Sequence, residues 1–239
     1  MASGEFGTNR LREIFLRAYA QKDHAVRCSF YRTIREHLLF ASPARQMFET
    51  HLLLWLWHCD YSYLSCTGST ASSPPLAIKP CKGNLKCFYK AEELKDISEP
   101  EKRICLVPTS RTFPTLDAIV LTREAVITVQ ITIALKHDAN EQEFDLIYKN
   151  LPPELLASRP GRYHVLITDN EINAKSLREQ SHMQIPNGTL VYSTAIGVES
   201  LDSMVPATEE RVVALEKARV SMLVICDLVF IGKYAGTSI

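Results

Sequence analysis

The sequence predicts an α/β fold in which a mixed β-sheet, with an antiparallel hairpin or meander, is flanked by helices. Helical patterns fill the first part of the chain, apolar strand patterns lie within residues 104–138, and helices then alternate with strands up to residue 219. Strands joined by a short turn pair antiparallel and strands joined through a helix pair parallel, so both pairings are expected in one sheet. The chain has 239 residues, 46% of them hydrophobic, which is long enough and apolar enough to form one large globular domain.

The first part of the chain divides into a short leader and a series of helices. Residues 1–9, which begin MASGEFGT, are typical of an expression-vector remainder, and we expect the chain to be a fragment of a longer protein. Apolar residues at helical spacing predict an N-terminal helical segment over residues 10–40, with a break near Asp23. The Ser-Pro pair at 42–43 then predicts an N-cap and a first-turn proline for the next helix, which becomes apolar all round and should be buried in its second half. This helix opens an α/β domain over residues 41–239.

The next segment holds a loop and a cluster of lysines. Residues 67–75, TGSTASSPP, have the composition of a linker or surface loop. The following stretch, KPCKGNLKCFYK, has two aromatic residues between its last two lysines and ends in a plausible strand. Such a patch can contact a phosphate backbone, but lysines also protect the edge strand of a sheet, and both interpretations stay open. The candidate nucleic-acid-binding residues are Lys79, Lys82, Lys86 and Lys90.

Strand and helix patterns alternate through the rest of the chain. A final apolar stretch at residues 220–231 fits either a helix or a strand and is too short to span a bilayer. The expected elements are a strand at 104–108, a hairpin at 113–138, an amphipathic helix at 138–150 stopped by Pro152 and Pro153, a strand at 163–169, a short helix at 172–180, a strand at 189–195 and a helix at 207–219.

Charge, cysteine usage and missing motifs exclude several classes of protein. Lys plus Arg equals Asp plus Glu at 27 each, so no overall charge indicates a membrane or nucleic-acid partner. The seven cysteines are odd in number and form no CxxC pair, which indicates reduced thiols of an intracellular protein rather than a disulfide frame. The sequence has no phosphate-binding loop motif and no GxSxG motif. We expect an intracellular protein with no membrane partner.

The hairpin at residues 113–138 carries the candidate site. Apolar residues alternate along its second strand, so one face packs on a core while Gln130 and Thr132 lie on the other face. A turn centred on residues 123–124 pairs Asp117 directly with Gln130, and directly opposed residues of an antiparallel pair point to the same face. This arrangement depends on the loop length, because a slip of one residue would send Asp117 to the other face.

Converging carboxylate and amide oxygens are ligands that Mg²⁺ accepts, and beside a phosphodiester such an ion can activate a water molecule. The simpler alternatives are a strand-end role for Asp117 and a core amide satisfied by backbone groups for Gln130. The hairpin therefore predicts either a metal site or two satisfied structural residues.

Four segments carry a resemblance to a known family. The helix SPARQMFETHLL, the strands FPTLDAIVL and VITVQITIALKHD, and the helix ending at YKNLP resemble the nuclease-like domain of Crinkler effectors and retrotransposon-hot-spot proteins, over residues 40–195. The resemblance implies a restriction-endonuclease-like PD-(D/E)XK domain that cleaves DNA with Mg²⁺. It also implies an effector acting in a host nucleus, or a transposon-derived relative.

Individual positions follow from this resemblance. Asp117 matches the motif aspartate, Gln130 matches the Glu/Gln position, and Glu49 is similar to a glutamate on the first helix; these three would hold the metal. The lysine position holds Thr132, and Lys136 lies four residues further along the same strand face. These five residues form the expected catalytic set, and His137 joins the lysine cluster as a candidate nucleic-acid contact.

The threonine at the lysine position keeps a second function open. A domain that has lost this lysine could retain the fold and act as a catalytically inactive pseudo-nuclease that binds DNA or a host protein. The retained oxygen ligands, and a lysine relocated to Lys136, favour an active magnesium-dependent endodeoxyribonuclease instead.

Overall fold

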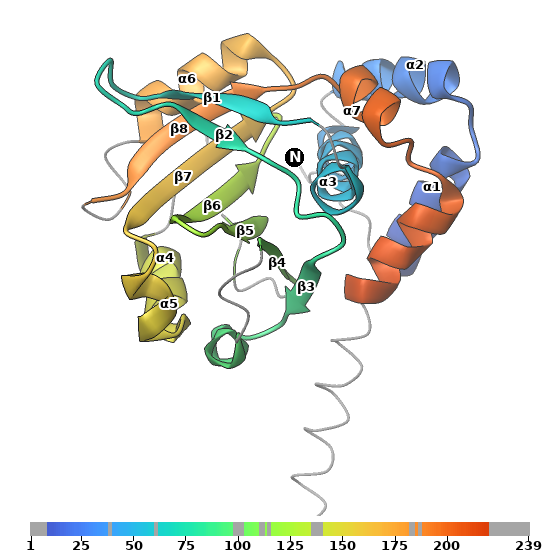
Figure 1. Cartoon of the computed structure of the whole chain (residues 1–239). Coiled ribbons are helices and arrows are strands. Elements are labelled where there is room, and N and C mark those ends of the chain that lie inside the picture. The colour runs from blue at the N-terminus through green and yellow to red at the C-terminus, as the bar shows by residue number, and fades with distance from the viewer. Residues whose placement is uncertain are drawn as a thin grey trace, which may run out of the picture.

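The computed structural model describes residues 9–37, 40–59, 62–97, 103–109, 113, 116–134, 141–181, 185 and 188–219 (Figure 1). The described chain begins with the helices α1 (Asn9–Ala20), α2 (His24–Arg35) and α3 (Ala41–His58). The side chain of Asp23 accepts a hydrogen bond from the amide of Val26 and caps α2, which explains the predicted break between the first two helices.

The start of α3 differs from the prediction. The sequence predicts Ser42 as the N-cap, whereas the helix begins at Ala41 and Phe40 holds the N-cap position without a side-chain hydrogen bond. Because proline lacks an amide hydrogen, it is tolerated in the first turn, where amides have no partner within the helix, so the Ser-Pro pair does not fix the first residue. The predicted burial of the second half is confirmed from Leu52 to Leu56, which are fully buried, whereas Trp57 is half-buried and His58 is exposed.

Eight strands within the described residues form one mixed sheet in the order β2-β1-β8-β7-β6-β5-β4-β3. They are β1 (Leu64–Gly68), β2 (Leu76–Ile78), β3 (Leu85–Phe88), β4 (Ile104–Pro108), β5 (Ala118–Leu121), β6 (Ala125–Ile131), β7 (Gly161–Thr168) and β8 (Leu190–Ala195). Pairing is parallel between β3 and β4 and from β6 through β7 to β8, and antiparallel between the other neighbours. The predicted mixed sheet is confirmed. Strands β1 and β2, which flank the Ser/Thr-rich loop, were not predicted.

The remaining helical elements follow the strands. They are η2 (Ala91–Asp96), α4 (Glu141–Asn150), α5 (Pro153–Ala157), α6 (Glu171–Ser181), α7 (Val198–Met204) and a final helix at residues 209–219. Pro153 begins α5 directly after α4, because proline fits the first position of a helix. Helix α7 was not among the predicted elements. Within the described ranges, no helix is long and apolar enough to cross a membrane.

The sheet separates two layers of helices, each with its own core (Figure 1). Ala118, Val129 and Ile131 face a core shared with α1, α2, α3, α7 and the final helix. Ile119 and Val126 face the opposite core, which contains residues of η2, α4 and α5. Helix α6 covers the same second face over β7 and β8. The described part of the N-terminal helical segment therefore packs on the sheet together with α3.

The β5–β6 hairpin has the predicted register. The amide of Thr122 donates to the carbonyl of Ala125 at 3.0 Å, which places the turn at residues 123–124. The ladder continues to the pair formed by Ala118 and Val129, where β5 begins. Asp117 thus lies one residue before the strand, next to the end of β6.

Candidate functional site

Asp117 completes the strand pairing at the beginning of β5. Its amide donates to the carbonyl of Val129 at 3.0 Å, and its carboxylate accepts a hydrogen bond from the amide of Ile131 at 2.6 Å. The carboxylate thus accepts the hydrogen bond of the Ile131 amide, which in a continuing strand pair would go to a backbone carbonyl. The strand-end role is therefore present, and it fixes where the carboxylate lies.

Helix α3 brings two charged side chains to this carboxylate. Arg45 and Glu49 are four residues apart, a spacing that places side chains on the same face of a helix. Nη2 of Arg45 lies 3.5 Å from Oδ1 of Asp117. Glu49 is buried and close enough for its negative charge to act on the Asp117 carboxyl. The structure therefore brings together two of the three expected metal ligands.

The surroundings of Asp117 favour its protonated form. Burial raises the pKa of Asp117 to about 7, and the charge of Glu49 adds to the rise. Arg45, the hydrogen bond from the Ile131 amide and Arg219 act in the opposite direction. Two carboxylates that share a buried site disfavour each other's ionisation unless a cation is present. The pair can therefore bind a cation or exchange a proton near neutral pH.

The final helix contributes a second guanidinium. Nη2 of Arg219 lies 2.5 Å from Oε1 of Glu49, and its Nη1 lies 3.7 Å from Oε1 of Glu216. Although burial works to lower the pKa of Arg219, the charges of Glu49 and Glu216 raise it. We call the set Arg45, Glu49, Asp117, Glu216 and Arg219 the carboxylate cluster.

The Asp117 carboxylate contacts α3, and the prediction that Gln130 shares a face with it stays a prediction. Val129 and Ile131 face the core beneath α3, so alternation along β6 places Gln130 on the opposite face. The Asp117 carboxylate turns to the Ile131 amide and to α3. The predicted register is confirmed, and the direction in which the Asp117 carboxylate points depends on its hydrogen bond to the Ile131 amide.

Of the two positions expected to supply the lysine function, Thr132 and Lys136, the structure describes only Thr132. Thr132 is buried, and its hydroxyl accepts a hydrogen bond from the amide of Ala134 at 3.1 Å while its own amide donates to Ile167. It therefore holds the chain in place after β6. Lys136 and His137 lie outside the described residues.

The predicted lysine cluster is exposed and extends along the β3 edge of the sheet, where Lys82 precedes β3 and Lys90 follows it at the end on which Asp117 lies. Lys86 projects from β3, an edge strand, and Phe88 of β3 pairs with Pro108 of β4. The β4–β5 register, continued by two residues, places Pro108 opposite Asp117, so Phe88 and Asp117 are two strand spacings apart, about 10 Å. The other members, Lys79, Lys82 and Lys90, are also exposed. Both interpretations, phosphate contact and edge protection, are compatible with this placement.

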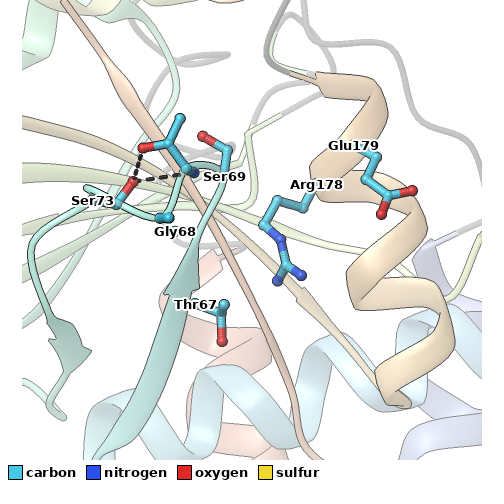
Figure 2. Close-up of a pocket in the computed structure, with 8 residues that line it drawn as sticks. Thr67, Gly68, Ser69, Ser73, Arg178 and Glu179 are labelled. Carbon is cyan, nitrogen blue, oxygen red and sulfur yellow. Dashed lines mark hydrogen bonds between the residues drawn. The ribbon is translucent and has the colours of Figure 1, made fainter.

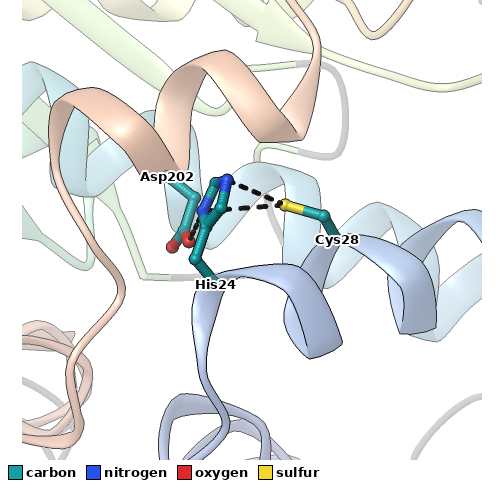
Figure 3. Close-up of side chains that lie close together, drawn as sticks. All are labelled: His24, Cys28 and Asp202. Carbon is teal, nitrogen blue, oxygen red and sulfur yellow. Dashed lines mark hydrogen bonds and ion pairs between the residues drawn. The ribbon is translucent and has the colours of Figure 1, made fainter.

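A second group of reactive side chains joins α2 to α7 (Figure 3). The ligand atoms of His24, Cys28 and Asp202 all lie within 4.8 Å of one another. Sγ of Cys28 is 3.8 Å from both ring nitrogens of His24, a position to which neither nitrogen lone pair points. Burial raises the pKa of the Cys28 thiol, whereas a metal ligand must be a thiolate. Oδ2 of Asp202 already accepts hydrogen bonds from Arg27 and His24, so the group is a polar junction between helices.

A cavity of about 560 Å³ lies between the loop after β1 and helix α6 (Figure 2). Hydroxyl groups of the loop, including Ser69 and Ser73, line it together with Arg178, whose Nη1 donates to Ser193 at 2.7 Å. In the order of the sheet, β8, β7 and β6 lie between β1 and β5. The cavity is therefore not part of the carboxylate cluster.

Several residues of these two groups were not predicted from the sequence. Arg45 has a local signal, because it lies one helical turn before Glu49 on α3. Arg219 is 170 positions from Glu49, and Asp202 is 175 positions from Arg27, so no local spacing relates either pair.

Comparison with known proteins adds no further constraint: no protein-family model, no curated protein and no solved structure matches the chain.

Proposed function

We propose that the chain is a metal-dependent DNA nuclease-like domain whose divalent cation, Mg²⁺, is held by Glu49 and Asp117. The observation that carries this proposal is the meeting of Glu49 on α3 with Asp117 at the beginning of β5, two positions that also match the Crinkler-like pattern. Two buried carboxylates form a site for a hard cation, which prefers oxygen ligands.

The order of the elements supports the finer description as a restriction-endonuclease-like domain. Helix α3 precedes the antiparallel strands β4, β5 and β6, and α4 and α5 then lead to the parallel strand β7. This is the meander followed by a crossover that the sequence predicts, and it places the helical carboxylate against the hairpin carboxylate. Action in a host nucleus belongs to the same proposal.

The chain's own residues have distinct roles in this proposal. Asp117 is oriented by the Ile131 amide, and Glu49 lies in the buried part of α3. Arg45 is partly exposed beside Asp117, where its guanidinium can pair with a phosphate group. Lys86 and Lys90 approach the same end of the sheet and can contact the backbone further along. The cation, when bound, supplies activation of water and stabilisation of developing charge.

The experiment that tests this function measures cleavage of plasmid and linear DNA with Mg²⁺ or with chelator. Cleavage is expected to require the metal and to be lost in Asp117→Asn and Glu49→Gln. Glu124→Gln, which removes an exposed carboxylate from the turn of the same hairpin, is the matched control and should retain activity. Cleavage that persists in Asp117→Asn would overturn the proposed nuclease function. The absence of cleavage in both native protein and Arg219→Gln would overturn it too.

A pseudo-nuclease is the second candidate, and the environment of Thr132 favours it. Thr132 occupies the expected lysine position, is buried, and uses its hydroxyl to accept the Ala134 amide, so it offers no charge to a reacting phosphate. This candidate predicts salt-dependent DNA binding, or binding to a host protein, without cleavage. Such binding should be unchanged by Asp117→Asn but weakened by Lys86→Ala.

A further inference from the structure

We infer that the final helix, residues 209–219, regulates the carboxylate cluster by placing Arg219 on Glu49 as an internal cation; the inference rests on the proposed function of the Glu49–Asp117 pair. Nη2 of Arg219 is 2.5 Å from Oε1 of Glu49, and the Arg219 side chain is only 14% exposed. Glu216, one turn earlier on the helix, supports the same guanidinium. The helix therefore delivers a positive charge to the place where a metal ion is needed.

The charge of Arg219 reaches both carboxylates of the pair. Oε1 of Glu49 is engaged in a charge-assisted hydrogen bond, the strong kind that a guanidinium forms with a carboxylate. Asp117 experiences the same positive charge, together with that of Arg45. The two guanidinium groups thus offset part of the negative charge that a divalent cation would otherwise compensate.

Arg219 and a divalent cation exclude each other at this site. A cation bound through the same Glu49 oxygen would lie close to the guanidinium, and like charges repel strongly where water is largely excluded. A cation that took the position of the guanidinium beside this oxygen would replace its hydrogen bond to Arg219. Metal binding at the pair is therefore expected only after Arg219 has left.

The helix is built so that Arg219 can leave without unfolding. Val212 and Leu215 are the apolar residues by which the helix is anchored in the core beneath α3. Arg219 lies one helical turn beyond Leu215, at the end of the described helix. A change of its side-chain conformation, or opening of the last turn, frees Glu49 while both anchors stay buried. The contact is thus an autoinhibitory one.

The test uses Mn²⁺ as the probe, titrated into the protein while the free ion is followed by electron paramagnetic resonance. Arg219→Gln is expected to bind Mn²⁺ at least about tenfold more tightly than native protein, since it removes a unit charge in contact with the site. Adding Asp117→Asn to this variant should abolish the gain. Lys217→Gln removes the same charge from an exposed position of the same helix and should behave like native protein, as should Arg219→Lys.

Circular dichroism and thermal melts of every variant establish that it is folded. Equal Mn²⁺ affinity of native protein and Arg219→Gln, or no binding by a folded Arg219→Gln, would overturn the inference. The DNA cleavage assay on the same samples separates the two proposals. If Arg219→Gln binds Mn²⁺ more tightly but neither protein cleaves DNA, only the proposed nuclease function is overturned. If native protein and Arg219→Gln bind Mn²⁺ equally and both show cleavage that depends on Asp117, only the regulatory role of Arg219 is overturned.

Discussion

Two aspartates with largely buried side chains, Asp117 and Asp202, each lie against an arginine, yet their pKa values are shifted in opposite directions. Asp202 accepts hydrogen bonds from Arg27 at 2.6 Å, from His24 at 2.7 Å and from the amide of Ala207 at 3.0 Å. Burial works to raise its pKa, but these donors hold it below the usual value. Burial raises the pKa of Asp117 to about 7, because it has one backbone donor and an arginine at 3.5 Å.

The difference shows how the number and sign of the neighbours decide the role of a buried carboxylate. The donors around Asp202 outweigh its desolvation, so it is ionised and joins α2 to α7. A second carboxylate, Glu49, lies beside Asp117 and works against its ionisation. Asp202 therefore joins two helices, whereas Asp117 has the environment that the proposed cation site requires.

Asp202→Asn should give the largest effect on stability. The substitution leaves the buried guanidinium of Arg27 without a counter-charge, which costs about 3–5 kcal/mol for a pair of this kind. The melting temperature should fall by roughly 6–20 °C at this chain length. Thermal and urea unfolding measure the change, with Asp117→Asn as the comparison. A native-like melting temperature for Asp202→Asn would contradict the structural role.

The pH dependence of stability should distinguish the two aspartates next. The folded pKa of Asp117 is raised above 3.8, so its contribution to stability is present in acid and is lost as pH rises through about 7. The Asp202 pKa is lowered, so its contribution is present above 3.8 and is lost as pH falls below it.

Urea unfolding between pH 4 and pH 8 tests whether the stability contributions of the two aspartates change in opposite directions with pH. Asp117→Asn keeps an acceptor oxygen for the Ile131 amide and should remove a decline on the order of 4 kcal/mol between acid and neutral pH. A native protein whose stability does not decline over this range, or a decline unchanged in Asp117→Asn, would show that Asp117 is ionised throughout.

Lys86→Ala should have the smallest effect on stability. Lys86 is exposed on an edge strand, so the free energy of unfolding should change by less than about 0.5 kcal/mol. If Lys86 contacts phosphate, DNA affinity should fall and the slope of log affinity against log salt should decrease by about 0.9. Fluorescence anisotropy measures both. Unchanged DNA binding with increased aggregation would instead support edge protection.

The parts of the fold that the sequence predicts are those governed by local rules. The register of β5 and β6 follows from a two-residue turn and from alternating apolar residues, and the structure has the expected turn at residues 123–124. Strands β1 and β2 are only five and three residues long, and β1 is held through pairing with the distant strand β8. Such short strands carry little periodic signal of their own.

The candidate site likewise has contacts that the sequence predicts and contacts that it does not. The proximity of Glu49 and Asp117 was expected from the family-like pattern, whereas the direction in which the Asp117 carboxylate points depends on a single hydrogen bond. Alternation assumes that each strand residue pairs through its backbone, whereas the Asp117 side chain takes the Ile131 amide. Arg219 reaches Glu49 across 170 positions, and no periodicity connects residues so far apart.

The carboxyl pKa of Asp117, measured by ¹³C NMR in native protein and in Glu49→Gln, tests most directly whether the two carboxylates act as a pair. A value near 7 is expected in the native protein, with a fall of about one unit or more when the charge of Glu49 is removed. A native value at or below 3.8 that does not respond to Glu49→Gln would contradict the pairing.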